Sequence, residues 1–263
     1  YAWTDDSELS GDGWAGRLSL AWRDQLWDVS AFHKRVGETF APDVGFVRRK
    51  GVRHTYATVG VHPRPGALNL QEVNPYAEVH YFTDLDGLLE TRALVGGFAA
   101  EFLDGSSASI EVERRFERLD EAFSIRPDAS ISAGEYEFSD VRLSYVSNQG
   151  RPMSARVDLS RGSFWDGDKT SLGITALWRV DARLGFDLFA ERNEVTLASG
   201  AFTADVVGLR ARYYYSTKLF TTAFFQYNAE LEELVTNLRI NLIHAPLSDL
   251  FLVLRERRHL GGE

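Results

Sequence analysis

The sequence predicts an all-β fold, a transmembrane antiparallel up-and-down β-barrel. Three observations lead to this prediction: apolar and polar residues alternate along most of the chain, the alternating segments are long, and turn-forming stretches separate them. Side chains of a strand point to opposite faces in turn, so each segment has one apolar and one polar face. Many segments reach the roughly 9–11 residues that a tilted strand needs to cross a bilayer, above the usual five or six.

About fourteen such strands divide the chain, which we take as one barrel domain over residues 1–263. The segment 171–180 is a clear case, because Leu172, Ile174 and Trp178 alternate with polar residues or glycine. Most charged strand residues fall on the polar face, and Glu78 and Arg114 are read as exceptions. The expected strands span residues 13–22, 26–34, 51–62, 70–83, 88–103, 107–118, 135–147, 152–165, 170–180, 183–193, 203–216, 218–228, 233–244 and 249–258.

A soluble β-sandwich or propeller also alternates, but its apolar face must pack against another sheet. The sequence has no repeated blade motif, and long strands in consecutive hairpins favour one closed sheet. Closure matters in lipid, where an open edge leaves unpaired N–H and C=O groups that cost several kcal/mol each.

Aromatic residues near the expected strand ends support the membrane interpretation. Amphipathic rings at strand ends are typical of the girdles that mark the two headgroup levels of a barrel. The residues concerned are Trp14, Trp22, Trp27, Tyr136, Tyr145, Trp165, Trp178, Tyr213, Tyr215 and Tyr227.

Composition excludes several other classes. The longest stretch without a charged residue, Leu219–Ala229, has eleven residues, too few for a membrane-spanning helix, which needs roughly 18. A net charge of −9 argues against a nucleic-acid partner. The absence of cysteine excludes disulfides, thiolate metal sites and cysteine nucleophiles, and fits export through an oxidising compartment.

The connections alternate between short and long, which predicts an orientation. Tight turns such as 23–25, 104–106 and 181–182 contrast with long connections at 35–50, 119–134 and 194–202. Outer-membrane barrels have short periplasmic turns and longer extracellular loops. Both chain ends would then lie outside, so we expect the chain to be part of a larger barrel of at least sixteen strands, with residues 1–4 continuing an upstream strand.

Several strings resemble one bacterial family of large outer-membrane proteins. The most specific is Phe-Ala-Pro-Asp-Val-Gly-Phe-Val-Arg-Arg at residues 40–49. Weaker strings in consistent order are Ser-Gly-Asp at 10–12, Trp-Arg-Asp at 22–24, Arg-Phe-Glu-Arg-Leu-Asp-Glu at 115–121, Ala-Gly-Glu-Tyr at 133–136, Gly-Asp-Lys-Thr-Ser-Leu at 167–172, Gln-Tyr-Asn at 226–228 and Ser-Asp-Leu-Phe-Leu-Val at 248–253.

Members of that family have an N-terminal domain similar to carbohydrate-binding module family 9, followed by a C-terminal barrel domain of unknown function. The resemblance covers nearly the whole chain and lies in the barrel part. It implies an outer-membrane location and a barrel architecture, with no reaction to carry over. The carbohydrate-binding module has no counterpart in these residues.

The polar faces should line the inside of the barrel, where opposed charges can form ladders or set the selectivity of a water-filled pore. The loop 119–134 could fold inward and plug that pore; Arg126-Pro127-Asp128 is a turn signal within it. The expected inward residues are Arg17, Asp28, Arg53, Glu101, Glu111, Glu113, Arg115, Arg142, Arg156, Asp158, Arg179, Asp187, Glu191, Arg210, Arg212, Arg239 and Arg255.

Signals for metals and catalysis are weak. An oxygen-rich stretch could hold Ca²⁺, but it departs from the spaced calcium-loop pattern and is better read as a solvated acidic loop; its candidates are Asp5, Asp6, Glu8 and Asp12. No serine and histidine share one strand face in a way that suggests a nucleophile and base. We expect no cofactor and no catalytic residues.

The leading hypothesis is a porin-like channel for small polar solutes or saccharides. The alternatives are a non-transporting anchor or scaffold for a periplasmic or surface module or an envelope complex, and, third, an outer-membrane hydrolase. The expected partners are the lipid bilayer and lipopolysaccharide, with other envelope proteins or glycans as further candidates.

Overall fold

The computed structural model describes residues 2–3, 13–42 and 45–261. Within these residues the secondary structure consists of strands joined by turns and loops, and no helix is long and apolar enough to cross a membrane. The strands are β1 (Ala2–Trp3), β2 (Trp14–Arg23), β3 (Trp27–Val36), β4 (Val52–Val61), β5 (Leu70–Asp84), β6 (Leu89–Phe102), β7 (Ser107–Leu119), β8 (Phe123–Arg126), β9 (Ala129–Ile131), β10 (Gly134–Val146), β11 (Met153–Phe164), β12 (Gly167–Arg179), β13 (Leu184–Leu197), β14 (Gly200–Tyr214), β15 (Leu219–Asn228), β16 (Glu233–Ala245) and β17 (Ser248–His259).

The fourteen strands expected from alternation are all present, as β2–β7 and β10–β17 in the described part of the chain. They pair in the order of the sequence, and neighbouring strands such as β2 and β3 or β13 and β14 run antiparallel. The strands therefore form one long meander, with β1 and β17 at its two ends and unpaired with each other in the described residues. The all-β, antiparallel, up-and-down prediction is confirmed at this level.

Two short elements lie outside the fourteen expected strands. Trp3 of β1 pairs with Trp14 at the start of β2, within the stretch expected to continue an upstream strand. Residues 119–134, expected as a loop, contain the β8–β9 hairpin with its turn at Pro127-Asp128. Ala129 and Ile131 are fully buried there, so apolar contacts give this loop a fixed structure that a turn signal alone does not predict.

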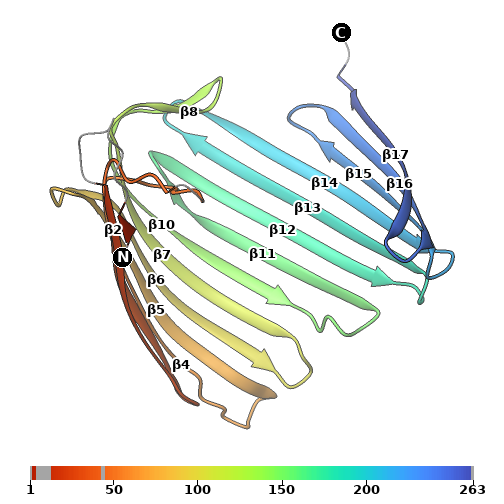
Figure 1. Ribbon diagram of the computed structural model, residues 1–263, viewed down its shortest axis with the longest axis horizontal. Coiled ribbons are helices and arrows are strands. Elements are labelled where there is room, and N and C mark those ends of the chain that lie inside the picture. Colours follow the sequence, from red (N-terminus) through yellow and green to blue (C-terminus); the bar gives the residue numbers. More distant parts are fainter. Residues whose placement is uncertain (1, 4–12, 43–44, 262–263) are drawn as a thin grey trace. The chain divides into compact units, whose positions relative to one another are not determined.

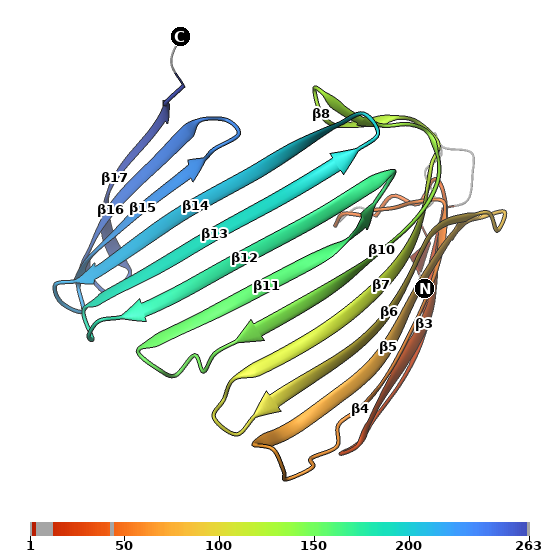
Figure 2. The same ribbon diagram turned by 180° about the vertical axis from the view of Figure 1, so that it is seen from behind.

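The chain divides into two compact units. The first comprises Tyr1–Ala100, Ile110–Val141 and Gly162–Asp166; the second comprises Glu101–Ser109, Arg142–Arg161 and Gly167–Glu263. Within the first unit, β2 to β7 lie side by side in chain order, and within the second unit, β12 to β17 do the same (Figure 1). Figure 2 shows the strands of each unit from behind.

In each unit, the register sorts side chains onto two faces, because directly opposed residues of neighbouring strands share a face. In the first unit, the row Ser19, Phe32, Tyr56, His80 belongs to what we call the polar face, and the row Leu20, Ala31, Ala57, Val79 to the apolar face. In the second unit, the corresponding rows are Asp187, Arg210, Phe224, Asn237, Arg255 and Trp178, Phe186, Ala211, Ala223, Leu238, Leu254.

The apolar face of each unit is the exposed one. Leu18 and Leu20 of β2 are 71% and 72% exposed, and interior strands show the same, with Val112 of β7 at 49% and Leu188 of β13 at 46%. Among the described residues, buried apolar side chains are few and include a cluster of Val36, Phe40 and Val52 beside the long loop 37–51. Within its own unit, the apolar face therefore has no layer of described residues packed against it.

Candidate functional site

The polar face of the first unit is a network of paired charges and aromatic rings. Tyr76 donates a 2.6 Å hydrogen bond to Glu111, which places Glu111 on this face, with Glu113 and Arg115 at alternate positions of the same strand. Arg115 bonds Glu113 and lies 3.5 Å from Glu117. These residues were expected to point inward, and the pairings place them on one face.

Two further inward candidates lie on β2 and β3. The guanidinium of Arg17 lies 4.0 Å above the ring of Phe32, within the range of a cation–π interaction. Asp28 forms an ion pair with Arg23 across the β2–β3 hairpin. Arg53, also expected inward, lies instead on the apolar face, opposite Arg35 and Thr83. Near the long loop both faces of β4 carry polar residues, so alternation alone does not separate them.

A chain of hydrogen bonds on the same face was not expected. Glu78 accepts from the Tyr56 hydroxyl at 3.0 Å and from Nε2 of His80 at 2.8 Å. Nδ1 of His80 lies 3.1 Å from Nε2 of His54, and the His54 ring stacks on Phe82 at 3.7 Å between centroids. Glu78, read as an exception to the alternation, thus belongs to the polar face.

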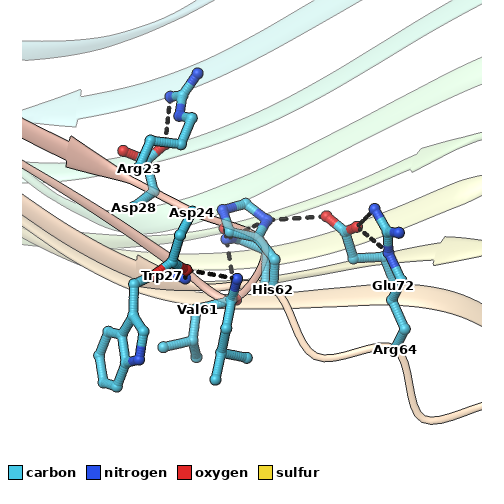
Figure 3. Close-up of polar contacts among 10 residues, drawn as sticks. Arg23, Asp24, Trp27, Asp28, Val61, His62, Arg64 and Glu72 are labelled. Atoms are coloured by element: carbon cyan, nitrogen blue, oxygen red, sulfur yellow. Dashed lines mark hydrogen bonds and ion pairs between the residues drawn. The ribbon is translucent and has the colours of Figure 1, made fainter.

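The short-turn end of this face is fixed by carboxylates (Figure 3). Glu72 accepts from His62 at 2.8 Å and from Nε of Arg64 at 3.0 Å. Asp24 accepts from the backbone N–H groups of Trp27 and Leu26 at 2.7 and 2.8 Å. The Trp27 bond, followed by those of Leu26 and the Trp22 indole, lowers the pKa of Asp24 below its ordinary value of 3.8.

On the second unit, the expected residues gather in two groups. In the first group, Asp158 accepts from Nε of Arg156 at 2.6 Å and also bonds Ser144. Beside it is a hollow of ≈ 540 Å³ whose polar lining includes Arg142, Asp158, Lys169, Ser171, Glu191 and Asn193. Hydroxyl, amide and charged groups therefore surround a space large enough for a small polar molecule.

The second group begins beside the short turns on β13 and β14 and extends to the middle of β16 and past the middle of β17. Asp187 pairs with both Arg210, at 3.7 Å, and Arg212. The guanidinium of Arg239 lies 4.4 Å from the ring centroid of Phe251, and Arg255 lies directly opposite Asn237. Arg179 donates to the backbone carbonyl of Arg151 at 2.6 Å. Glu101 occupies the same side of β6 as Gly97, by alternation.

Charges on the apolar face are confined to the long-loop ends of the strands. In the first unit, Glu137 bridges Arg92 and Arg114, each at 2.7 Å, and Arg118 pairs with Glu135 at 2.6 Å. In the second, Arg192 pairs with Glu194 at 2.8 Å and Asp205 at 3.3 Å, and Arg258 with Glu256 at 3.0 Å. We call these residues the charged belt; Arg114 belongs to it, which accounts for its place outside the alternation.

Aromatic residues of the apolar face mark the opposite ends of the strands, beside the short turns. Trp22, Trp27, Tyr145, Trp178 and Tyr213 all lie there and are all exposed. At the long-loop ends, Phe123, Tyr136 and Phe138 pack around Trp165 instead, with ring centroids 5.3–5.5 Å apart. Only part of the expected aromatic set therefore lies exposed on the apolar face beside the short turns.

The remaining candidates are the carboxylates of the acidic N-terminal stretch and the histidines. Asp5, Asp6, Glu8 and Asp12 lie outside the described residues. In the residues that are described, no group of three histidines or carboxylates is arranged to hold a metal ion. In the described residues, the side chains of His33 and His62 bond Thr55, Glu72 and Asn74, and those of His54 and His80 bond each other, with His80 also bonding Glu78. No family model, curated protein or solved structure matches the chain.

Proposed function

We propose that the chain forms the wall of a β-barrel in the bacterial outer membrane, whose polar face lines an aqueous lumen that passes small polar solutes, including saccharides. The observation that carries this proposal is the exposed apolar face, opposite a face of paired charges. Apolar surface left in water costs about 25 cal/mol per Å², and soluble monomers rarely expose large contiguous apolar patches. Lipid removes that cost.

The height of the apolar band fits a bilayer. On β6 the band runs from Leu94, just beyond Arg92 of the charged belt, to Phe102 at the short turn. At about 3.4 Å per residue this is ~27 Å along the strand, or ~20 Å of depth at a tilt of about 40°, close to the roughly 25 Å apolar band of outer-membrane barrels. The exposed aromatic residues then lie at one headgroup level and the charged belt beyond the other.

The proposal includes a closed sheet and an orientation. The outer edge of β17 carries N–H and C=O groups that need partners in lipid, so we place the sheet in a closed barrel of at least sixteen strands. The short turns face the periplasm and the long loops face outward. We also propose that the chain belongs to the outer-membrane family whose members carry an N-terminal domain similar to carbohydrate-binding module family 9. The sequence strings that resemble this family support that assignment.

Planar-bilayer recordings with the purified protein test the proposal. We expect stepwise increases in conductance, and swelling of protein-containing liposomes in isotonic arabinose. Protein that inserts stably into vesicles yet gives neither signal would contradict the channel and favour the anchor or scaffold. Protein that stays in the aqueous phase with vesicles present would contradict the barrel itself.

A further inference from the structure

The polar face of the second unit carries a band of arginines that runs from the short-turn end of β14 to the middle of β16 and past the middle of β17. One row of directly opposed residues runs Arg212, Thr222, Arg239, Val253, and the next runs Asp187, Arg210, Phe224, Asn237, Arg255. These two rows therefore hold four guanidiniums and one carboxylate across β13–β17. Guanidinium groups stay protonated throughout the physiological range, so the excess positive charge is permanent.

The single carboxylate is already engaged. Asp187 pairs with both Arg210 and Arg212, and its side chain is 16% exposed. For Arg239 and Arg255, no carboxylate of the described residues lies within the 4.0 Å of an ion pair. The neighbouring Arg257 does have such a partner, Glu233, at 3.3 Å. Positive charge without a carboxylate is thus concentrated at the two arginines of β16 and β17.

Aromatic rings lie beside two of these arginines, Arg239 and Arg210, of which only Arg210 also pairs with a carboxylate of the described residues. Arg239 lies over Phe251 at 4.4 Å, and Arg210 lies 5.3 Å from the ring centroid of Phe224. Arg239 donates from one terminal nitrogen to the side-chain oxygen of Asn241 at 3.5 Å. A guanidinium stacked on a ring presents its other N–H donors at the edge of its plane. Arg239 and Arg255 occupy diagonal positions on adjacent strands, about 7–8 Å apart, with Asn237 beside them. That spacing lets two forks of donors converge on one carboxylate or phosphate group.

We propose that Arg210, Arg239 and Arg255 form an oxyanion-binding band that makes the lumen select solutes carrying carboxylate or phosphate groups over neutral or cationic ones. This inference rests on the proposed channel and names its substrate class. The other carboxylates of the polar face on these strands, Glu191, Glu233 and Asp249, lie outside the two rows, and Glu233 already pairs with Arg257. Their distance leaves the band positive.

Reversal potentials in planar bilayers under a KCl gradient test the band. We expect the native protein to prefer Cl⁻ over K⁺, and Arg239→Gln combined with Arg255→Gln to lower the permeability ratio by about threefold, because two fixed charges near the ion path are removed. Asn237→Asp adds a carboxylate opposite Arg255 and should lower the ratio without deleting an arginine. Arg258→Gln changes the net charge by one unit, as Asn237→Asp does, but Arg258 lies on the apolar face of β17. This variant should therefore leave the permeability ratio unchanged.

Liposome swelling separates the two proposals. Gluconate and glucose have similar size, so the native protein should admit gluconate faster, and the double variant should lose that advantage while still admitting glucose. A protein with no conductance would overturn the channel and this inference with it. A conducting protein that shows no preference for Cl⁻ or gluconate, or whose preference survives both the double variant and Asn237→Asp, would overturn the inference alone.

Discussion

The ring of Tyr76 occupies the space that a side chain at position 97 would need. A Cβ added at Gly97 would come within 2.2 Å of Cζ of Tyr76, so the absence of a side chain on β6 lets the tyrosine of β5 reach across to β7. Its hydroxyl there donates to Glu111. One glycine thus permits a contact that ties three strands of the first unit together on the polar face.

Gly97→Ala should therefore destabilise the protein, by about 1–3 kcal/mol, because the Tyr76 ring must move and its bond to Glu111 is lost. Guanidinium unfolding in detergent micelles, followed by tryptophan fluorescence, measures the change. Gly96→Ala is the matched control, since nothing lies within 4 Å of a Cβ at that position. Equal midpoints for the two variants would contradict the role given to Gly97.

The identity of the lipid-facing side can be tested with two neighbours on β3. Ala31 lies in the apolar row with Leu20, whereas Ser30 lies between Ala21 and Thr58 on the polar face. Arginine at a lipid-facing position near the midplane costs about 2–4 kcal/mol, so Ala31→Arg should impair folding into phosphatidylcholine vesicles, measured by sedimentation and protease protection. Ser30→Arg should insert as well as the native protein; the opposite order would invert the assigned faces.

The chain contains no cysteine, so single cysteines report accessibility without background. On β14, Leu209 is 37% exposed on the apolar face and Arg210 is its neighbour on the polar face. In vesicles, a membrane-impermeant charged maleimide should label Arg210→Cys and leave Leu209→Cys unlabelled, because lipid excludes the reagent from one and water admits it to the other. Both should be labelled after denaturation, and equal labelling in vesicles would argue against a lipid-facing apolar side.

Acid should weaken the β2–β3 turn. The lowered pKa of Asp24 means that its carboxylate stabilises the fold at pH above 3.8, and that this stabilisation is lost as pH falls through the lower, folded pKa. Asp24→Asn keeps an oxygen for the Leu26 and Trp27 N–H groups but cannot titrate. Its unfolding midpoint should therefore depend less on pH between about 2 and 5, while Asp24→Ala should be less stable than the native protein at neutral pH.

The alternation of apolar and polar residues predicts which segments form strands. It says much less about which side chains are in contact. The fourteen long strands follow from period two, because each has one face of aliphatic residues. The series of hydrogen bonds that links Tyr56, Glu78, His80 and His54 depends on the register of β4 against β5. A sequence pattern does not determine that register. Arg53 was assigned to the wrong face because Thr55 and Tyr56, just beyond it, give both sides of β4 a polar residue.

The position of the charged belt determines how far the long loops lie from the apolar band. On β7 the belt begins at Arg114, and the strand continues to Leu119, so about 15 Å of strand extends past the apolar band before the β8–β9 hairpin begins. In a membrane, that extension would form a rigid collar, cross-braced by Glu137 and Glu135, that lifts the hairpin clear of the lipid headgroups. A molecule arriving from outside would meet protein first, and the geometry of that entrance would not change with the thickness of the surrounding bilayer.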